Sequence, residues 1–279
     1  MALFLFIIPP TIFAVSKTES YKDIIEKAFN LSLQKERNQA INLLSVAAKK
    51  ESKKNPQAMK DIKEAIEQIA TVFYTEKAQQ AYELANSVAM TDSGLALTQL
   101  REANKIEPEN LTIEGAIIRI MIATGDCSGA EKRVEKWLDI ANLNETIALL
   151  HAQTKICLGK YDEFKHIKST VIDIKNSTLL TIWQLSEAEV LNKQGQFQKS
   201  NELLTEMEGV ASSTNAANPE IFYWKFKNHT ELKLPADTFG QKYINSCKAL
   251  SQRSIQSFSF YPFLCKRVTE VESALKASK

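Results

Sequence analysis

Apolar residues recur from Tyr21 onward at intervals of three and four positions, which is the period of a helix with one buried face. Ala28 and Leu31 share one such face, and Ala40 and Leu44 share the next. No alternation of useful length indicates a β-strand. The pattern predicts helices of roughly 12–18 residues that follow one another to the end of the chain.

The expected breaks between these helices are regularly spaced. They fall near 35–38, 91–94, 124–128, 159–162 and 195–197. Gly125 and Gly159 are 34 residues apart, Gly159 and Gly195 are 36 apart, and Ala96 and Ala130 are again 34 apart. A fixed period of this length is typical of a repeat protein built from pairs of helices.

One segment carries the fullest pattern of small and apolar residues. It consists of Ala96, Leu100, Ala103 and Pro108. With the glycines, this pattern resembles the tetratricopeptide repeat (TPR) family, whose 34-residue unit is a pair of packed helices, A and B. The repeats are degenerate, because Phe164 and Ser200 stand where a small residue should open helix B.

The resemblance implies an all-α fold, a right-handed α-solenoid of TPR-like helix pairs. It covers a repeat domain at 17–216, with units near 21–54, 77–110, 111–144, 145–180 and 181–216. An inserted helix is expected at about 55–76, and its apolar pattern predicts that it continues into Ala85. Residues 217–279 form an atypical C-terminal helical cap, with helices beginning near Pro219 and Pro235 and a third at about 255–276 that breaks at Pro262.

The first residues, 1–16, differ from the rest of the chain. Met1–Val15 carries no charge and ends in small residues that continue to Ser16, and charged residues begin at Lys17. This run is too short to span a membrane and is typical of a secretory signal peptide. The alternative is an apolar N-terminal element packed on the body. After cleavage, no integral membrane span is expected.

The amino-acid composition of the chain excludes some classes of function. The chain has 8 Gly and 7 Pro, where average usage would give roughly 20 and 14. Glycine-rich phosphate-binding motifs are absent from the sequence, so no nucleotide cofactor is expected. Residues 219–279 hold ten Lys and Arg against five Asp and Glu, within a chain of net charge +2. Solvated helix faces explain this basic segment more simply than a nucleic-acid or lipid partner.

The four cysteines form two candidate disulfides. Cys247 and Cys265 flank a turn of the predicted cap, and Cys127 and Cys157 lie near corresponding turns of successive units. Free buried cysteines are the alternative for each pair. No C-x-x-C motif occurs and the three histidines have no metal-site spacing, so no metal is expected.

The TPR resemblance implies that the concave groove, lined by the first helix of each unit, holds a protein or peptide. In this register the groove residues are Phe29, Arg119, Ile122, Leu149, Gln153, Ile156, Leu185, Glu189 and Asn192. The alternative is that each packs against the next helix.

We therefore expect a non-catalytic protein- or peptide-binding scaffold or adaptor, exported across the inner membrane to the periplasm or envelope of a bacterium. An accessory subunit of an envelope machine for secretion, motility or polysaccharide export is the first alternative. An enzyme on a helical solenoid is the second, although no catalytic constellation stands out in the sequence.

Overall fold

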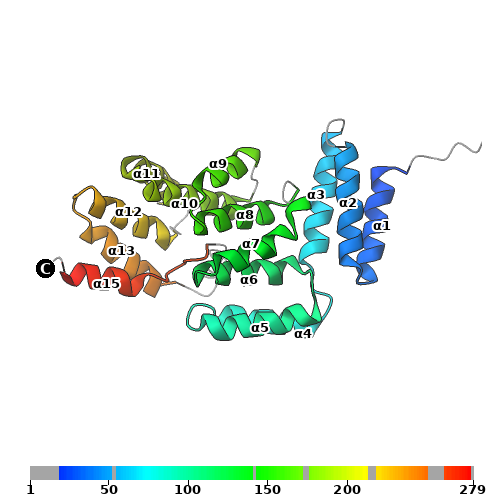
Figure 1. Cartoon of the computed structure of the whole chain (residues 1–279), viewed down its shortest axis with the longest axis horizontal. Helices are drawn as coiled ribbons and strands as arrows, with labels where there is room; N and C mark the ends of the chain where they lie inside the picture. The colour runs from blue at the N-terminus through cyan, green and yellow to red at the C-terminus, as the bar shows by residue number, and fades with distance from the viewer. Residues whose placement is uncertain are drawn as a thin grey trace, which may run out of the picture.

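The computed structural model describes residues 19–51, 55–140, 143–171, 176–212, 218–250 and 261–277. In these ranges the chain forms fourteen α-helices and one short 3₁₀-helix, with α1–α3 at one end of an elongated molecule and α12, α13 and α15 at the other (Figure 1). The all-α prediction is confirmed for these ranges. The predicted signal peptide at 1–16 and the first part of the helix predicted at 255–276 lie outside them.

The helices α1 to α7 are Tyr21–Leu33, Arg37–Glu51, Pro56–Thr71, Glu76–Val88, Ser93–Ile106, Leu111–Ala123 and Cys127–Glu135. The 3₁₀-helix is Leu138–Ile140. The helices α8 to α13 are Glu145–Cys157, Tyr161–Thr170, Ser177–Lys193, Phe197–Ser212, Pro219–Glu231 and Asp237–Lys248, and α15 is Val268–Ala277.

Asparagine side chains begin the first helices of four pairs. Asn110, Asn144, Asn176 and Asn218 are the N-caps of α6, α8, α10 and α12, and each side chain accepts a hydrogen bond from a backbone N–H of the first turn. Such a cap satisfies a donor that has no partner within the helix. Pro219 follows Asn218 at the first turn of α12, where the missing N–H of proline costs nothing.

Glycines end three of these first helices. Gly125, Gly159 and Gly195 follow α6, α8 and α10 with φ angles of 84°, 72° and 73°. This left-handed backbone disfavours residues with a Cβ, which explains why glycine recurs at this position. The glycines are spaced by 34 and 36 residues because each lies at the turn between the two helices of one of these three pairs.

Successive helices pack as adjacent pairs: α1 with α2, α4 with α5, α6 with α7, α8 with α9, α10 with α11, and α12 with α13. The first helices of neighbouring pairs also touch, since α6 contacts α8, α8 contacts α10, and α10 contacts α12. This arrangement is consistent with a helical repeat. The pair α12–α13 extends it, although its sequence does not match the repeat.

Small residues allow the helices of each pair to approach closely. Ala96, Ala130 and Ala188 are all fully buried. At one departure from the pattern, Ser200 is also buried, and its hydroxyl donates to the Ala188 carbonyl at 2.8 Å. At the other, Phe164 fills the larger space and lies 6.1 Å from Trp183, measured between ring centroids.

The predicted continuation of the helix at 55–76 into Ala85 is wrong. Helix α3 ends at Thr71, Val72 is extended, and α4 begins at Glu76 after the N-cap Thr75. Helix α3 contacts α1, α2 and α6, whereas α4 packs mainly on α5. The α4–α5 hairpin therefore lies beside α6 rather than taking its place in the row of first helices (Figure 1).

A buried ion pair holds this break. Arg37 lies 3.3 Å from Glu107, and its Nε donates to the Ile69 carbonyl at 3.0 Å. The second Glu107 oxygen accepts from the backbone N–H groups of Tyr74 at 2.8 Å and Thr75 at 2.7 Å. In a continuous helix, the N–H groups of Tyr74 and Thr75 and the carbonyl of Ile69 would form hydrogen bonds within the helix. Here Glu107 and Arg37 supply their partners instead.

Candidate functional site

Four of the predicted groove residues line one cavity. Ile122 on α6, Gln153 and Ile156 on α8, and Glu189 on α10 surround a space of about 620 Å³. These residues come from the first helices of three successive pairs, which contact one another. The volume falls in the range of sites that hold small ligands or side chains.

The other five predicted residues do not line this cavity. Leu149 and Leu185 are 1% and 0% exposed in the core, so their assignment to an open groove is wrong. Phe29 packs on the separate core of α1–α3. Asn192 donates to the Asn228 side chain at 2.8 Å and so joins α10 to α12. Burial lowers the pKa of the Arg119 guanidinium, which lies near Tyr82 of α4.

The remaining wall is a segment that the sequence did not assign to the groove. We call residues 261–267, which directly precede α15, the strap. Tyr261, Pro262, Phe263 and Arg267 of the strap line the cavity. The strap crosses the molecule from the cap toward α6 and α7 (Figure 1), and Phe263 packs on the apolar cluster of α6, α7 and α8.

A chain of three side chains anchors the start of the strap. The indole N–H of Trp224 donates to the Tyr261 hydroxyl at 2.9 Å, and that hydroxyl donates to Glu189 Oε2 at 2.8 Å. Burial raises the pKa of Glu189, while nearby Arg267 and the bond from Tyr261 oppose the shift. The strap therefore meets the floor of the cavity at a buried carboxyl group.

A second anchor lies at the other end of the strap. Glu220 accepts the backbone N–H of Cys265 at 2.7 Å and pairs with Arg267 at 3.3 Å. The Arg267 guanidinium also lies over the rings of Tyr223 at 4.4 Å and Phe263 at 4.3 Å. Burial raises the pKa of Glu220 to about 7, although the positive charge of Arg267 opposes the shift.

Lys266 joins the strap to the α4–α5 hairpin. Its ammonium group donates to the carbonyls of Ala89 at 2.6 Å and Met90 at 3.3 Å, at the end of α4. The C-terminal end of a helix carries partial negative charge, which favours a cation there. The strap thus connects the C-terminal cap to an element more than 170 positions earlier in the chain.

Both candidate disulfides are present. Cys247 of α13 is bonded to Cys265 of the strap, and Cys127 of α7 is bonded to Cys157 of α8, each with Cα atoms 5.6 Å apart. Cys265 has a left-handed backbone with φ of 53°, a conformation that costs a residue with a Cβ some free energy.

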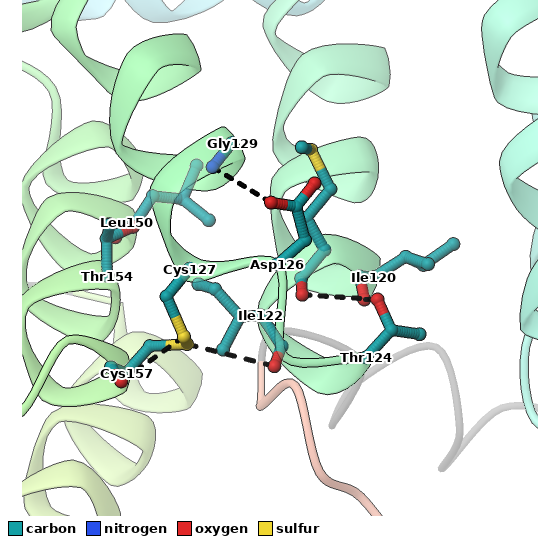
Figure 2. The surroundings of a disulfide bond; sticks show 10 residues. Ile120, Ile122, Thr124, Asp126, Cys127, Gly129, Leu150, Thr154 and Cys157 are labelled. Atoms are coloured by element: carbon teal, nitrogen blue, oxygen red, sulfur yellow. Dashed lines mark hydrogen bonds between the residues drawn. A yellow bond between two sulfur atoms is a disulfide. The ribbon is translucent and has the colours of Figure 1, made fainter.

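The Cys127–Cys157 bond borders the cavity. Figure 2 shows it at the start of α7, next to the Asp126 side chain that accepts the Gly129 N–H at 3.0 Å and so caps this helix. Cys157 and Phe263 of the strap both line the cavity and both pack on the apolar cluster of α6, α7 and α8, and the strap passes beside the disulfide in Figure 2. The bond joins the start of α7 to the end of α8 beside the cavity.

Within the described ranges, we found no group of three or more His, Cys, Asp or Glu side chains suited to holding a metal ion. In the same ranges, no helix is both long enough and apolar enough to cross a membrane.

No match was found when the chain was compared with models of known protein families, with curated proteins and with solved structures. The architecture of packed helix pairs therefore rests on the structure itself, and no family is assigned.

The strap is the wall of the cavity that the sequence did not predict. Its local signal was the run Tyr261-Pro262-Phe263, in which a proline between two aromatic residues interrupts the expected helix. Two large apolar side chains beside a helix breaker favour a segment packed on another surface.

Proposed function

We propose that this protein is a non-catalytic binding protein that receives a short segment of a partner protein or peptide in the cavity between α6, α8, α10 and the strap. The observation that carries the proposal is the cavity of about 620 Å³, whose lining combines apolar, aromatic and charged side chains. Such a mixture is typical of a recognition site, where apolar contacts give affinity and a few polar groups set orientation.

We further propose that the protein acts outside the cytoplasm, in the periplasm or envelope of a bacterium. Two disulfides support this location, because such bonds persist in oxidising compartments. The apolar run at 1–15 supports export by its composition. Mass spectrometry of the protein purified from cell fractions tests this part: a periplasmic species starting at Lys17 is expected, and a cytosolic species with Met1 would contradict it.

Photo-crosslinking in the source cells tests the binding proposal. A photoreactive residue placed at Lys193, which is exposed and lines the cavity, should form a discrete adduct with a partner. The matched control is Lys199, which is also exposed but lies on α11 and outside the cavity lining. Adducts of equal yield from both positions, or no adduct at Lys193, would contradict binding in the cavity.

A further inference from the structure

The carboxyl group of Glu189 is buried at the cavity without a salt bridge. The residue is 6% exposed, and within the described ranges its side chain accepts a hydrogen bond from the neutral Tyr261 hydroxyl. No lysine, arginine or histidine of the described ranges forms an ion pair with it, because Arg267 pairs with Glu220 instead. A carboxylate in this position gains most from a cation that arrives with a ligand.

The surrounding backbone adds to the negative potential. Helices α6 and α8 both end at the cavity, where Ala123, Gly125, Leu158 and Gly159 contribute to its lining. The C-terminal end of each helix carries partial negative charge. Two helix ends and one carboxyl group therefore favour a positively charged group at the same place.

The walls are suited to the stem of a basic side chain. Tyr161, Tyr261 and Phe263 line the cavity together with Ile122 and Ile156. Aliphatic carbons pack on such surfaces, and aromatic faces attract a lysine or arginine head group.

A hydroxyl group in the lining lacks a partner. Ser186 is 1% exposed, and its Oγ makes no hydrogen bond within the described structure. It lines the same cavity as Glu189, one helical turn earlier on α10. A buried hydroxyl group without a partner is costly, and a bound hydrogen-bond donor would remove that cost.

Two cations also line the cavity, and the charges of Arg267 and Lys193 oppose the raised pKa of Glu189, but neither forms an ion pair with its carboxyl group within the described ranges. Arg267 forms its ion pair with Glu220 and stacks on Tyr223 and Phe263, so its charge is shared between Glu220 and the more distant Glu189. Lys193 is exposed at the end of α10, and its flexible stem allows the ammonium group to remain in water.

We propose that the cavity binds a lysine or arginine side chain of a partner polypeptide, with its charged group at Glu189 and its stem between Tyr161, Tyr261 and Phe263. This inference rests on the proposed binding function and adds the chemistry of the residue that is recognised.

A matched pair of peptides tests the charge requirement. The probes are acetylated and amidated pentapeptides, Leu-Ala-X-Ala-Leu, in which X is arginine or the isosteric neutral residue citrulline. Titration calorimetry should give the arginine peptide at least a tenfold lower Kd, a difference of about 1.4 kcal/mol. Equal affinities would leave the binding function standing and overturn the cationic preference. Binding of neither peptide at millimolar concentration would also overturn it.

Protein variants locate the charge. Glu189→Gln keeps an acceptor for Tyr261 and should abolish the difference between the two peptides, while Glu187→Gln on the same helix should preserve it. Glu187 is a suitable control because it pairs with Lys168 and does not line the cavity. A Glu189→Gln variant that folds and retains the arginine preference would overturn the assignment. Agmatine supplies the same guanidinium group without a peptide; tighter binding of agmatine than of the arginine peptide would overturn a polypeptide ligand.

Discussion

Glu220 and Arg267 form an ion pair of 3.3 Å in which the carboxylate side chain is fully buried and the guanidinium is 15% exposed. The pair joins the first turn of α12 to the strap, 47 positions later. Because Tyr261 and Phe263 of the same strap line the cavity, the pair also fixes one wall of the proposed binding site.

Removing Arg267 should destabilise the protein strongly. Arg267→Met leaves a buried carboxylate without a cation, which costs about 3–5 kcal/mol of unfolding free energy. Urea denaturation at pH 8 measures this loss, and the double variant with Glu220→Gln should recover part of it. Lys60→Met breaks the exposed pair with Glu64 and serves as the control, with an expected effect of less than about 1 kcal/mol. An Arg267→Met loss as small as that of the control would contradict the structural role.

The Glu220 carboxyl group should make stability fall as the pH rises. Burial raises its pKa from 4.5 to about 7 in the folded protein. Between these pH values the folded state binds more protons than the unfolded state, so unfolding becomes easier with increasing pH. The contribution is about 3 kcal/mol, at about 1.4 kcal/mol for each pH unit. Glu220→Gln should therefore remove a downward slope from the stability profile between pH 4.5 and 7; an identical slope in the variant would contradict the raised pKa.

Loss of the Cys247–Cys265 disulfide should release the strap. The bond closes a loop of 18 positions, and its removal by serine substitution should cost about 3 kcal/mol. Hydrogen exchange should increase at 261–267. The matched control replaces Cys127 and Cys157, whose loop of 30 positions gives a similar cost, but should raise exchange mainly near the start of α7. Equal exchange of the strap in both variants would argue against this bond as its anchor.

The helix pairs were predictable because their signals are local. Gly125 and Gly159 adopt the left-handed backbone that ends a first helix, and Asn110 and Asn144 cap the helices that the sequence placed after them. Each signal acts within one turn of its own residue. The spacing of these glycine and asparagine residues in one sequence is therefore sufficient to place most helix ends in this region.

The break between α3 and α4 was not predictable in this way. The apolar period continues through Val72 and Phe73, and neither glycine nor proline interrupts it. The backbone turns there because Glu107, more than 30 positions later, accepts the N–H groups of Tyr74 and Thr75. The position of the strap depends on still longer contacts, such as that of Lys266 with Ala89.

The same distinction explains the outcome for the candidate site. The TPR resemblance and its register placed Ile122, Gln153, Ile156 and Glu189 in a groove, and these four residues line one cavity. The same register placed Leu149 and Leu185 in the groove, but neighbouring helices bury them. The sequence pattern of one helix does not show which of its faces a neighbouring helix covers. Sequence alone therefore located three walls of the cavity and missed the fourth.

Arginine at the small positions of the helix pairs should be poorly tolerated. Ala96 and Ala130 are fully buried, so Ala96→Arg or Ala130→Arg combines overpacking with burial of a charge and should cost more than about 3 kcal/mol. Thr98→Arg is the control, because Thr98 is exposed on the same helix as Ala96; its expected effect is within about 0.5 kcal/mol. Thermal unfolding measures both. An Ala96→Arg variant that melts with the wild type would show that the packing assigned to α4 and α5 is wrong.

Glu107 should affect stability with the opposite pH dependence to Glu220. Burial alone would raise its pKa, but hydrogen bonds from Asn110, Thr75 and Arg37 outweigh burial and lower it. A lowered pKa in the folded state means that the stabilisation is complete above the unfolded value and is lost as the pH falls through the folded one. Glu107→Gln should therefore be less stable than the wild type at pH 7, and the difference in urea-unfolding free energy should shrink below about pH 4. A difference that stays constant down to pH 3 would mean that Glu107 acts through its shape and not through its charge.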